Sequence, residues 1–296
     1  MNDAIHKNGR YIAGIDIGTR MTKCAIFDLL SEKVIAHTTL LTGHNLALAS
    51  EKILDETCKS ANLKTSDIFY VASTGYGRYQ APMRQIQITD ISCHAMGARH
   101  LFPNTSSVLD VGAQNAKAMR IDENGRVVKF RMNDKCASGA GRFLERVAKG
   151  LELELEEIGA LSLRSKDPQP ISSICAVLAE SEVINLVTTG YPVEDILMGT
   201  NLSISDRIVA LLRQVSSDGE VTLTGGITKN VGMVKALEQK VGKHLNVCED
   251  SEYAGAIGAC LLARRRLKKL EEQKMMADGT IPMAANSNQK SEIKNV

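Results

Sequence analysis

GIDIGTRMTKCAIFD at residues 14–28 and LDVGAQNAKAMRID at residues 109–122 are two versions of one pattern. In each, an apolar run ends in Asp-x-Gly, and a short turn of small and polar residues leads into a second apolar run that ends in Asp. Four positions match, and the members of every pair are 94 residues apart: Asp16 and Asp110, Gly18 and Gly112, Lys23 and Lys117, Asp28 and Asp122. The repetition predicts two β-hairpins that each place an acidic group beside a tight backbone turn.

The turns of these hairpins have the chemistry of a phosphate site. Glycine lets backbone amides approach phosphate oxygens closely, and an aspartate at a strand end can hold hydrated Mg²⁺ or orient a water for attack on a terminal phosphate. We expect Asp16 to coordinate Mg²⁺ through water and Asp110 to align the attacking water, although either could instead cap its turn. Whether Arg20 and Lys23 contact phosphate or face solvent stays open. The candidate residues of the hairpins are Asp16, Gly18, Thr19, Arg20 and Lys23 in the first and Asp110, Gly112, Ala113, Gln114 and Asn115 in the second.

A third glycine element, VTLTGGITKNVGMVKALEQKVG at residues 221–242, reads as a strand, a Gly-Gly turn and a helix. The turn and the helix N-terminus can seat the adenosine and the α-phosphate of a nucleotide, and Gly225, Gly226 and Asn230 are assigned to that side. By itself this element could be an ordinary strand-to-helix turn. Behind two phosphate hairpins it predicts a nucleotide cleft.

Composition excludes several classes of protein. The 296 residues are 44% apolar and 24% charged, which is typical of a globular protein of about two domains. A net charge of +2 without a sustained basic run argues against nucleic acid as a partner. We see no signal peptide and no apolar run of membrane-spanning length, so we expect a cytoplasmic protein with no membrane partner. Seven widely spaced cysteines without a CxxC pair argue against a disulfide framework.

The order of hairpin, hairpin and TGG turn resembles the acetate kinase, sugar kinase, Hsp70 and actin superfamily. Within it, four stretches resemble the BadF/BadG/BcrA/BcrD ATPases, which activate 2-hydroxyacyl-CoA dehydratases and drive benzoyl-CoA reductases. The resemblance covers residues 11–267 and implies an α/β fold with two RNase H-like domains that close over ATP and Mg²⁺. The four stretches are STGYGRY (73–79), ISCHAMGARHLFP (91–103), MNDKCASGAGRFLE (132–145) and ISSICAVLAESEVINLV (171–187).

Two cysteines of these motifs are candidate metal ligands. Cys136 precedes one predicted helix and Cys175 lies in the first turn of another, where the partial positive charge of a helix N-terminus favours thiolates. Two cysteines are half of the four that a 4Fe–4S cluster normally needs. The resemblance implies that two subunits share one 4Fe–4S cluster, with Cys136 and Cys175 as the ligands from this chain. Cys93 is expected to pack in the core and His94 to be a hydrogen-bonding structural residue.

The resemblance further implies an energy-coupling ATPase that uses ATP to deliver low-potential electrons. Ferredoxin or flavodoxin would supply the electron, and separate iron–sulfur subunits that bind an aryl-CoA or acyl-CoA would accept it. Asn115 stands where dehydratase activators usually carry an acidic residue, which puts the hydrolytic competence of this hairpin in doubt. The change is easier to tolerate when a second, homologous ATPase subunit shares the cluster. The ATPase subunit of a class I benzoyl-CoA reductase is therefore favoured over a homodimeric dehydratase activator. A sugar or N-acetylglucosamine kinase and an actin-like ATPase without a cluster are alternatives of another class.

The predicted organisation has four parts. The N-terminal extension covers residues 1–10, the first RNase H-like domain 11–100 and the second, with the cluster cysteines, 101–255. A helix over 254–272 is expected to pack back across the first domain. Residues 274–296 lack periodicity and are predicted to be a mobile tail.

Overall fold

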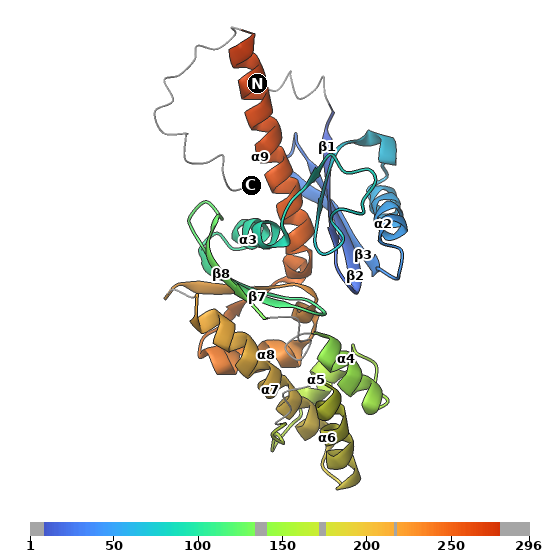
Figure 1. The fold of residues 1–296 in the computed structure, drawn as a ribbon, viewed down its shortest axis with the longest axis vertical. Helices are drawn as coiled ribbons and strands as arrows, with labels where there is room; N and C mark the ends of the chain where they lie inside the picture. Colours follow the sequence, from blue (N-terminus) through green and yellow to red (C-terminus); the bar gives the residue numbers. More distant parts are fainter. Residues whose placement is uncertain (1–8, 134–140, 172–175, 216–217, 279–296) are drawn as a thin grey trace.

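The computed structural model describes residues 9–133, 141–171, 176–215 and 218–278, and the fold is that of these residues. They form two α/β units, each built on a five-stranded sheet, and the long helix α9 (Ala254–Ala277) runs along the first unit (Figure 1). Among the helices described, none is long and apolar enough to cross a membrane.

The first sheet has the strand order β3-β2-β1-β4-β5. β1 pairs antiparallel with β2 and β2 with β3, whereas β1 pairs in parallel with β4 and β4 with β5. β1 and β2 are buried over almost their whole length, which explains their continuous apolar runs. The strands are β1 (Tyr11–Ile17), β2 (Met21–Asp28), β3 (Lys33–Leu41), β4 (Ile68–Thr74) and β5 (Ile86–Gln87).

The second sheet repeats this arrangement with the order β10-β9-β6-β7-β8. β6 pairs antiparallel with β7 and β7 with β8, and the pairs β6 with β9 and β9 with β10 are parallel. The two hairpins predicted from the sequence repeat, β1–β2 and β6–β7, are therefore confirmed. The strands are β6 (Thr105–Val111), β7 (Ala116–Ile121), β8 (Val127–Met132), β9 (Glu220–Thr224) and β10 (Leu245–Asn246).

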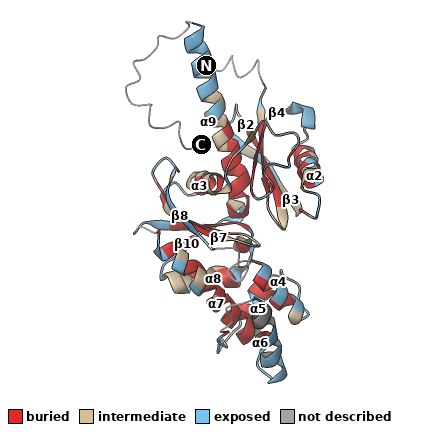
Figure 2. Ribbon diagram, in the orientation of Figure 1, coloured by how far each residue is buried: buried red, intermediate tan, exposed pale blue. Residues whose placement is uncertain are grey.

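Two helices cover opposite faces of the first sheet. α2 (Leu46–Ser60) packs Ile53 against a core that includes Ile15, while α9 packs Ile257 against a second core that includes Ile12 and Phe27. The alternation of side chains along the strands sends Ile12 and Ile15 to different faces. Figure 2 shows the buried inner part of α9 on the sheet and its exposed outer end.

α3 (Asp90–Leu101) lies between the two units. Ala95 and Ala98 of this helix pack against Met119 and other side chains of the second sheet, and α3 also packs on α9. The two helices cross in backbone contact, because a side chain at Gly97 would collide with the carbonyl group of Ala254. This contact fixes the distance between the units beside the cleft.

A helical segment joins β8 to β9 and forms the far end of the second unit. Its helices share one apolar core with the sheet, in which Phe143 and Leu144 meet Val183, Ile204 and Leu223. The short turn η3 (Gly226–Lys229) and α8 (Val231–Val241) follow β9, and η4 (Glu249–Tyr253) leads into α9. The segment holds α4 (Gly141–Gly150), α5 (Ile158–Ser162), α6 (Ala176–Thr188) and α7 (Val193–Arg213).

The helix predicted after the TGG turn is confirmed as α8. Asn230 caps the helix through its side chain, which accepts a hydrogen bond of 2.9 Å from the Met233 amide. Met233 and Leu237 of this helix are buried in the core, whereas Val231 is half exposed. Val231 is the first residue of the helix and follows the capping residue Asn230.

Candidate nucleotide site

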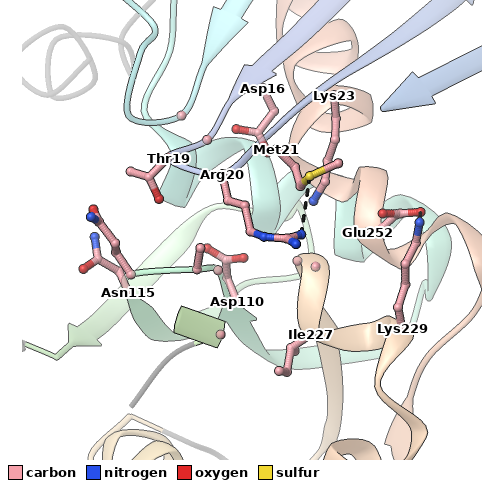
Figure 3. A pocket seen from close by; sticks show the side chains of 18 of the residues that line it. Asp16, Thr19, Arg20, Met21, Lys23, Asp110, Asn115, Ile227, Lys229 and Glu252 are labelled. Atoms are coloured by element: carbon pink, nitrogen blue, oxygen red, sulfur yellow. Dashed lines mark hydrogen bonds and ion pairs between the residues drawn. The ribbon is translucent and has the colours of Figure 1, made fainter. Parts of the chain in front are cut away.

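A cavity of about 320 Å³ lies between the two units, large enough for part of a nucleotide. Its walls come from the turns of both hairpins, the turn after β9 and the inner end of α3 (Figure 3). The structure brings together every residue that the sequence assigned to the nucleotide. These are Asp16, Gly18, Thr19, Arg20, Lys23, Asp110, Gly112, Ala113, Gln114, Asn115, Gly225, Gly226 and Asn230.

The two hairpins present the same pair of charges to the cavity. Asp16 lies opposite Lys23 in the β1–β2 register, and Asp110 lies opposite Lys117 in the β6–β7 register. All four side chains are buried. Burial of charges is costly, and in the second hairpin the 3.1 Å contact between Nζ of Lys117 and Oδ2 of Asp110 offsets part of that cost.

Each hairpin turn is closed by one backbone hydrogen bond at the same place. The Gly18 amide donates to the Met21 carbonyl at 3.1 Å, and the Gly112 amide donates to the Asn115 carbonyl at 2.9 Å. Residues of both turns line the cavity. This geometry suits backbone contact with phosphate oxygens from two sides.

A glycine on the neighbouring parallel strand packs against each aspartate. Gly75 after β4 has φ of +85° and Gly225 after β9 has φ of +90°, a conformation that favours glycine. A Cβ atom at Gly225 would lie 2.8 Å from Oδ1 of Asp110, and one at Gly75 would collide with Oδ1 of Asp16. The paired glycines therefore leave the carboxylates open to the cavity.

His94 of α3 lies between the two aspartates. Its Nε2 is 3.6 Å from Oδ2 of Asp16, and its Nδ1 is 3.3 Å from Oδ1 of Asp110 and 3.1 Å from the Thr224 hydroxyl. Burial disfavours the charged imidazole, but the carboxylates of Asp110 and Asp16 raise the pKa of His94 above its ordinary value. Burial likewise opposes ionisation of Asp16, yet His94 and the nearby lysines lower the pKa of that carboxyl group. The predicted hydrogen-bonding role of His94 is confirmed, and its place in the site is new.

Lys117 connects the second hairpin to α3. Its Nζ lies 2.7 Å from Oδ2 of Asp90 and 3.1 Å from Oδ2 of Asp110. Burial opposes the charge on Lys117, but these two carboxylates raise its pKa well above the ordinary lysine value. Lys117 therefore remains an ammonium group that neutralises and orients Asp110.

The residues present fit a nucleotide with Mg²⁺. Carboxylate oxygens such as those of Asp16 and Asp110 are the ligands that Mg²⁺ prefers, directly or through water. The Nδ2 atom of Asn230 is buried at the cavity and has no hydrogen-bond partner in the described part of the chain. An unpaired buried donor is costly, so this amide is suited to donate to a bound group.

The two predicted cluster ligands, Cys136 and Cys175, lie outside the described residues. Cys136 precedes α4 and Cys175 immediately precedes α6, and these two helices pack against each other. Cysteines 24, 58, 93 and 260 are free and buried, and burial raises the pKa of the Cys93 thiol as expected for a core residue. In the residues that the structure describes, no group of three or more His, Cys, Asp or Glu side chains could hold a metal ion.

Residues 13–263 match the profile of the BadF/BadG/BcrA/BcrD ATPase family. The chain belongs to this family. It is accordingly an ATP-binding ATPase, and the predicted fold of two RNase H-like units, of the actin and sugar kinase type, is confirmed.

The relatives of this chain include a benzoyl-CoA reductase subunit and activators of dehydratases. One subunit of the benzoyl-CoA reductase of Thauera aromatica is 39% identical over 267 residues, which cover 87% of this chain and 94% of that protein. The activator of lactoyl-CoA dehydratase from Anaerotignum propionicum is 37% identical over 263 residues, 88% of this chain and 99% of that protein. The solved activator of the 2-hydroxyisocaproyl-CoA dehydratase from Clostridium difficile, with bound ADPNP, has a TM-score of 0.83 at 35% identity and covers 89% of this chain and 97% of that chain.

Several lining residues were not expected from the sequence. Lys117 belongs to the hairpin repeat and Gly75 to the STGYGRY stretch, so a signal for both was present. Glu145 of α4 is the last residue of the MNDKCASGAGRFLE stretch, but nothing in that stretch assigned it to the nucleotide. Glu252 carries no local signal; it is buried and pairs with Lys229 at 2.7 Å. These carboxylates reach the cavity only through the tertiary fold.

Proposed function

We propose that this ATPase is the energy-coupling subunit of a low-potential electron-transfer system. It would hold half of a 4Fe–4S cluster through Cys136 and Cys175, with a second ATPase subunit supplying the other half. The observation that carries the proposal is the attachment of α4 to the nucleotide site. The amides of Gly141 and Arg142 at the start of this helix donate hydrogen bonds of 2.9 and 2.8 Å to the carbonyl groups of Gly112 and Ala113 in the second hairpin.

This attachment links the ATP cleft to the helix that follows the Cys136 motif. A movement of the hairpin turn on nucleotide binding or hydrolysis is passed to α4 through two backbone hydrogen bonds and not through a flexible side chain. α6, which follows Cys175, packs on α4 and shares its core. A cluster bound at the cysteines would supply the electron, and its potential would respond to the position of these helices.

Within the cleft, different residues of the chain have different roles in ATP hydrolysis. Asp16 would hold hydrated Mg²⁺, and Asp110 would orient the attacking water. Lys117 and His94 fix the direction of the Asp110 carboxylate, since both contact it. Gly225, Gly226 and Asn230 would contact the adenosine end of the nucleotide.

For the electron acceptor, we propose the iron–sulfur subunits of a class I benzoyl-CoA reductase, with ferredoxin or flavodoxin as the donor. The relative that is 39% identical and the Asn115 side chain in the second turn support this choice. A homodimeric activator of a 2-hydroxyacyl-CoA dehydratase is the second candidate. It is supported by the TM-score of 0.83 to such an activator, whose length the chain matches almost completely.

The test reconstitutes the protein anaerobically with iron and sulfide, alone and together with a homologous ATPase subunit. Each preparation is reduced and offered two acceptors, the catalytic subunits of a benzoyl-CoA reductase with benzoyl-CoA and a dehydratase with its 2-hydroxyacyl-CoA. ATP-dependent loss of benzoyl-CoA only with the sister subunit supports the first proposal. Dehydration activated by the protein alone supports the second. ATP hydrolysis without iron binding and without turnover in either assay refutes both.

A further inference from the structure

An ion pair crosses the nucleotide cleft between Arg20 and Glu145. Arg20 lies in the turn between β1 and β2, and its Nε pairs with Oε1 of Glu145 on α4. Both residues line the cavity, and their side chains are 34% and 31% exposed. Figure 3 shows Arg20 extending from the first hairpin into the cavity that separates it from Asp110. The pair is therefore within reach of a ligand that enters the cleft.

Each end of this ion pair is attached to a hairpin that faces the nucleotide. The Arg20 carbonyl accepts a hydrogen bond of 2.8 Å from the Thr42 amide, which fixes the backbone of the first turn. Glu145 stands on α4, whose first amides are bonded to the second turn at Gly112 and Ala113. The Arg20–Glu145 pair therefore ties the first unit to the helix that follows the Cys136 motif.

The guanidinium group of Arg20 cannot pair fully with Glu145 and with a nucleotide phosphate at the same time. In this structure its Nε faces Glu145 and its Nη1 lies 3.6 Å from the Met21 sulfur, a weak partner. A triphosphate brings several negative charges and planar sets of acceptor oxygens, which arginine binds more strongly than it binds one exposed carboxylate. Phosphate and Glu145 therefore compete for Arg20.

We propose that the Arg20–Glu145 pair is an autoinhibitory latch that the phosphates of a bound nucleotide open by capturing Arg20. Opening removes this ion pair between α4 and the first unit while leaving α4 attached to the second hairpin. The latch rests on ATP binding in this cleft and not on the identity of the electron acceptor. Linkage is reciprocal. A nucleotide that breaks the pair must therefore bind more tightly to a protein in which a substitution of Glu145 has already removed the pair and left Arg20 in place.

Nucleotide affinity tests the latch through two substitutions with opposite signs. Glu145→Gln releases Arg20 and should tighten binding of a non-hydrolysable ATP analogue by about two- to five-fold, the worth of an exposed ion pair. Arg20→Gln should weaken binding, because the phosphates lose a cation. Isothermal titration of the reconstituted full chain measures both. Weaker or unchanged binding by Glu145→Gln would overturn the latch, since a static brace predicts that result.

A double-mutant cycle separates the latch from simple charge repulsion. If Glu145 acts only by occupying Arg20, then Glu145→Gln has no effect on affinity in an Arg20→Gln background. If it acts by repelling phosphate, the gain persists in that background and the latch is wrong. Glu156 lines the same cavity and has no ion pair within the described residues, so Glu156→Gln measures the repulsion of a single carboxylate.

Hydrogen exchange in α4 gives a readout that does not depend on affinity. The amides of Gly141–Gly150 should exchange faster in Glu145→Gln than in the parent without nucleotide, and the analogue should raise exchange in the parent toward the variant's rate. Slower exchange in the parent on binding the analogue, with no change caused by Glu145→Gln, would show that the pair does not restrain α4. Electron transfer is not needed for this result, so failure of the latch and failure of the proposed function remain distinguishable.

Discussion

Replacement of Gly225 by alanine should damage the nucleotide site by forcing the turn after β9 to move. Gly225 has φ of +90° and ψ of 178°, a region that residues with a side chain almost never occupy. Forcing alanine into it costs on the order of 1–3 kcal/mol. The added Cβ would also lie 2.6 Å from the Val111 carbonyl oxygen and 2.8 Å from Oδ1 of Asp110, closer than real Cβ contacts. The turn must therefore shift, and Asp110 shifts with it.

The effect of Gly225→Ala can be measured as a change in the melting temperature and as a change in the rate of ATP hydrolysis. For a chain of this size, roughly 2–4 °C of melting temperature corresponds to 1 kcal/mol, so Gly225→Ala should lower the melting temperature by about 2–12 °C. ATP hydrolysis should fall further than stability explains, because the carboxylate that orients water is displaced. The assays are thermal unfolding without nucleotide and steady-state ATP hydrolysis at a temperature where both proteins are folded.

Gly226→Ala is the matched control in the same turn. A Cβ atom at Gly226 meets nothing within 4 Å, and its φ lies outside the left-handed region. This variant should unfold at the parent temperature or slightly above it. The stereochemical reasoning would be refuted if Gly225→Ala were as stable as the parent protein. Equal destabilisation by the two substitutions would refute it as well.

Three further outcomes follow from the site. Asp110→Asn should reduce the rate of ATP hydrolysis by about 100-fold or more and leave nucleotide binding nearly intact; near-parental hydrolysis would remove Asp110 from the proposed role. Cys136→Ser and Cys175→Ser should each abolish electron delivery while sparing ATP affinity, as measured by anaerobic turnover and titration; retained delivery in both would reject the ligand assignment. The hydrogen bonds from Arg10 hold the pKa of Asp28 well below its usual range, so their stabilisation is present above about pH 4 and disappears as the pH falls through the lowered pKa. The free energy of unfolding in urea, measured from about pH 6 down to about pH 3, should begin to fall in the parent protein. The fall should be smaller in Arg10→Gln.

The hairpins and the TGG turn could be predicted from the sequence because their information is local. The spacing of Asp16, Gly18 and Lys23 sets a strand end, a turn and a cross-strand partner within one short stretch, and the second copy repeats it. All the glycines and polar residues assigned on that basis do line one cavity.

Other parts of the site depend on contacts that no local pattern contains. His94 looked like an ordinary buried histidine, yet the crossing of α3 with α9 places it between two aspartates from different sheets. Glu145 ends the MNDKCASGAGRFLE stretch, and only the docking of α4 on the second hairpin brings it to Arg20. Local spacing does not specify which elements meet across a cleft.

The iron content per chain, measured together with the mass of the particle that holds it, decides whether two chains share one cluster. After anaerobic reconstitution, we expect about two iron atoms per ATPase chain, one 4Fe–4S spectrum per pair of chains, and loss of both iron and pairing in a Cys136→Ser, Cys175→Ser double variant. A monomer with a complete cluster, or an ATPase that delivers electrons without iron, would contradict the shared cluster.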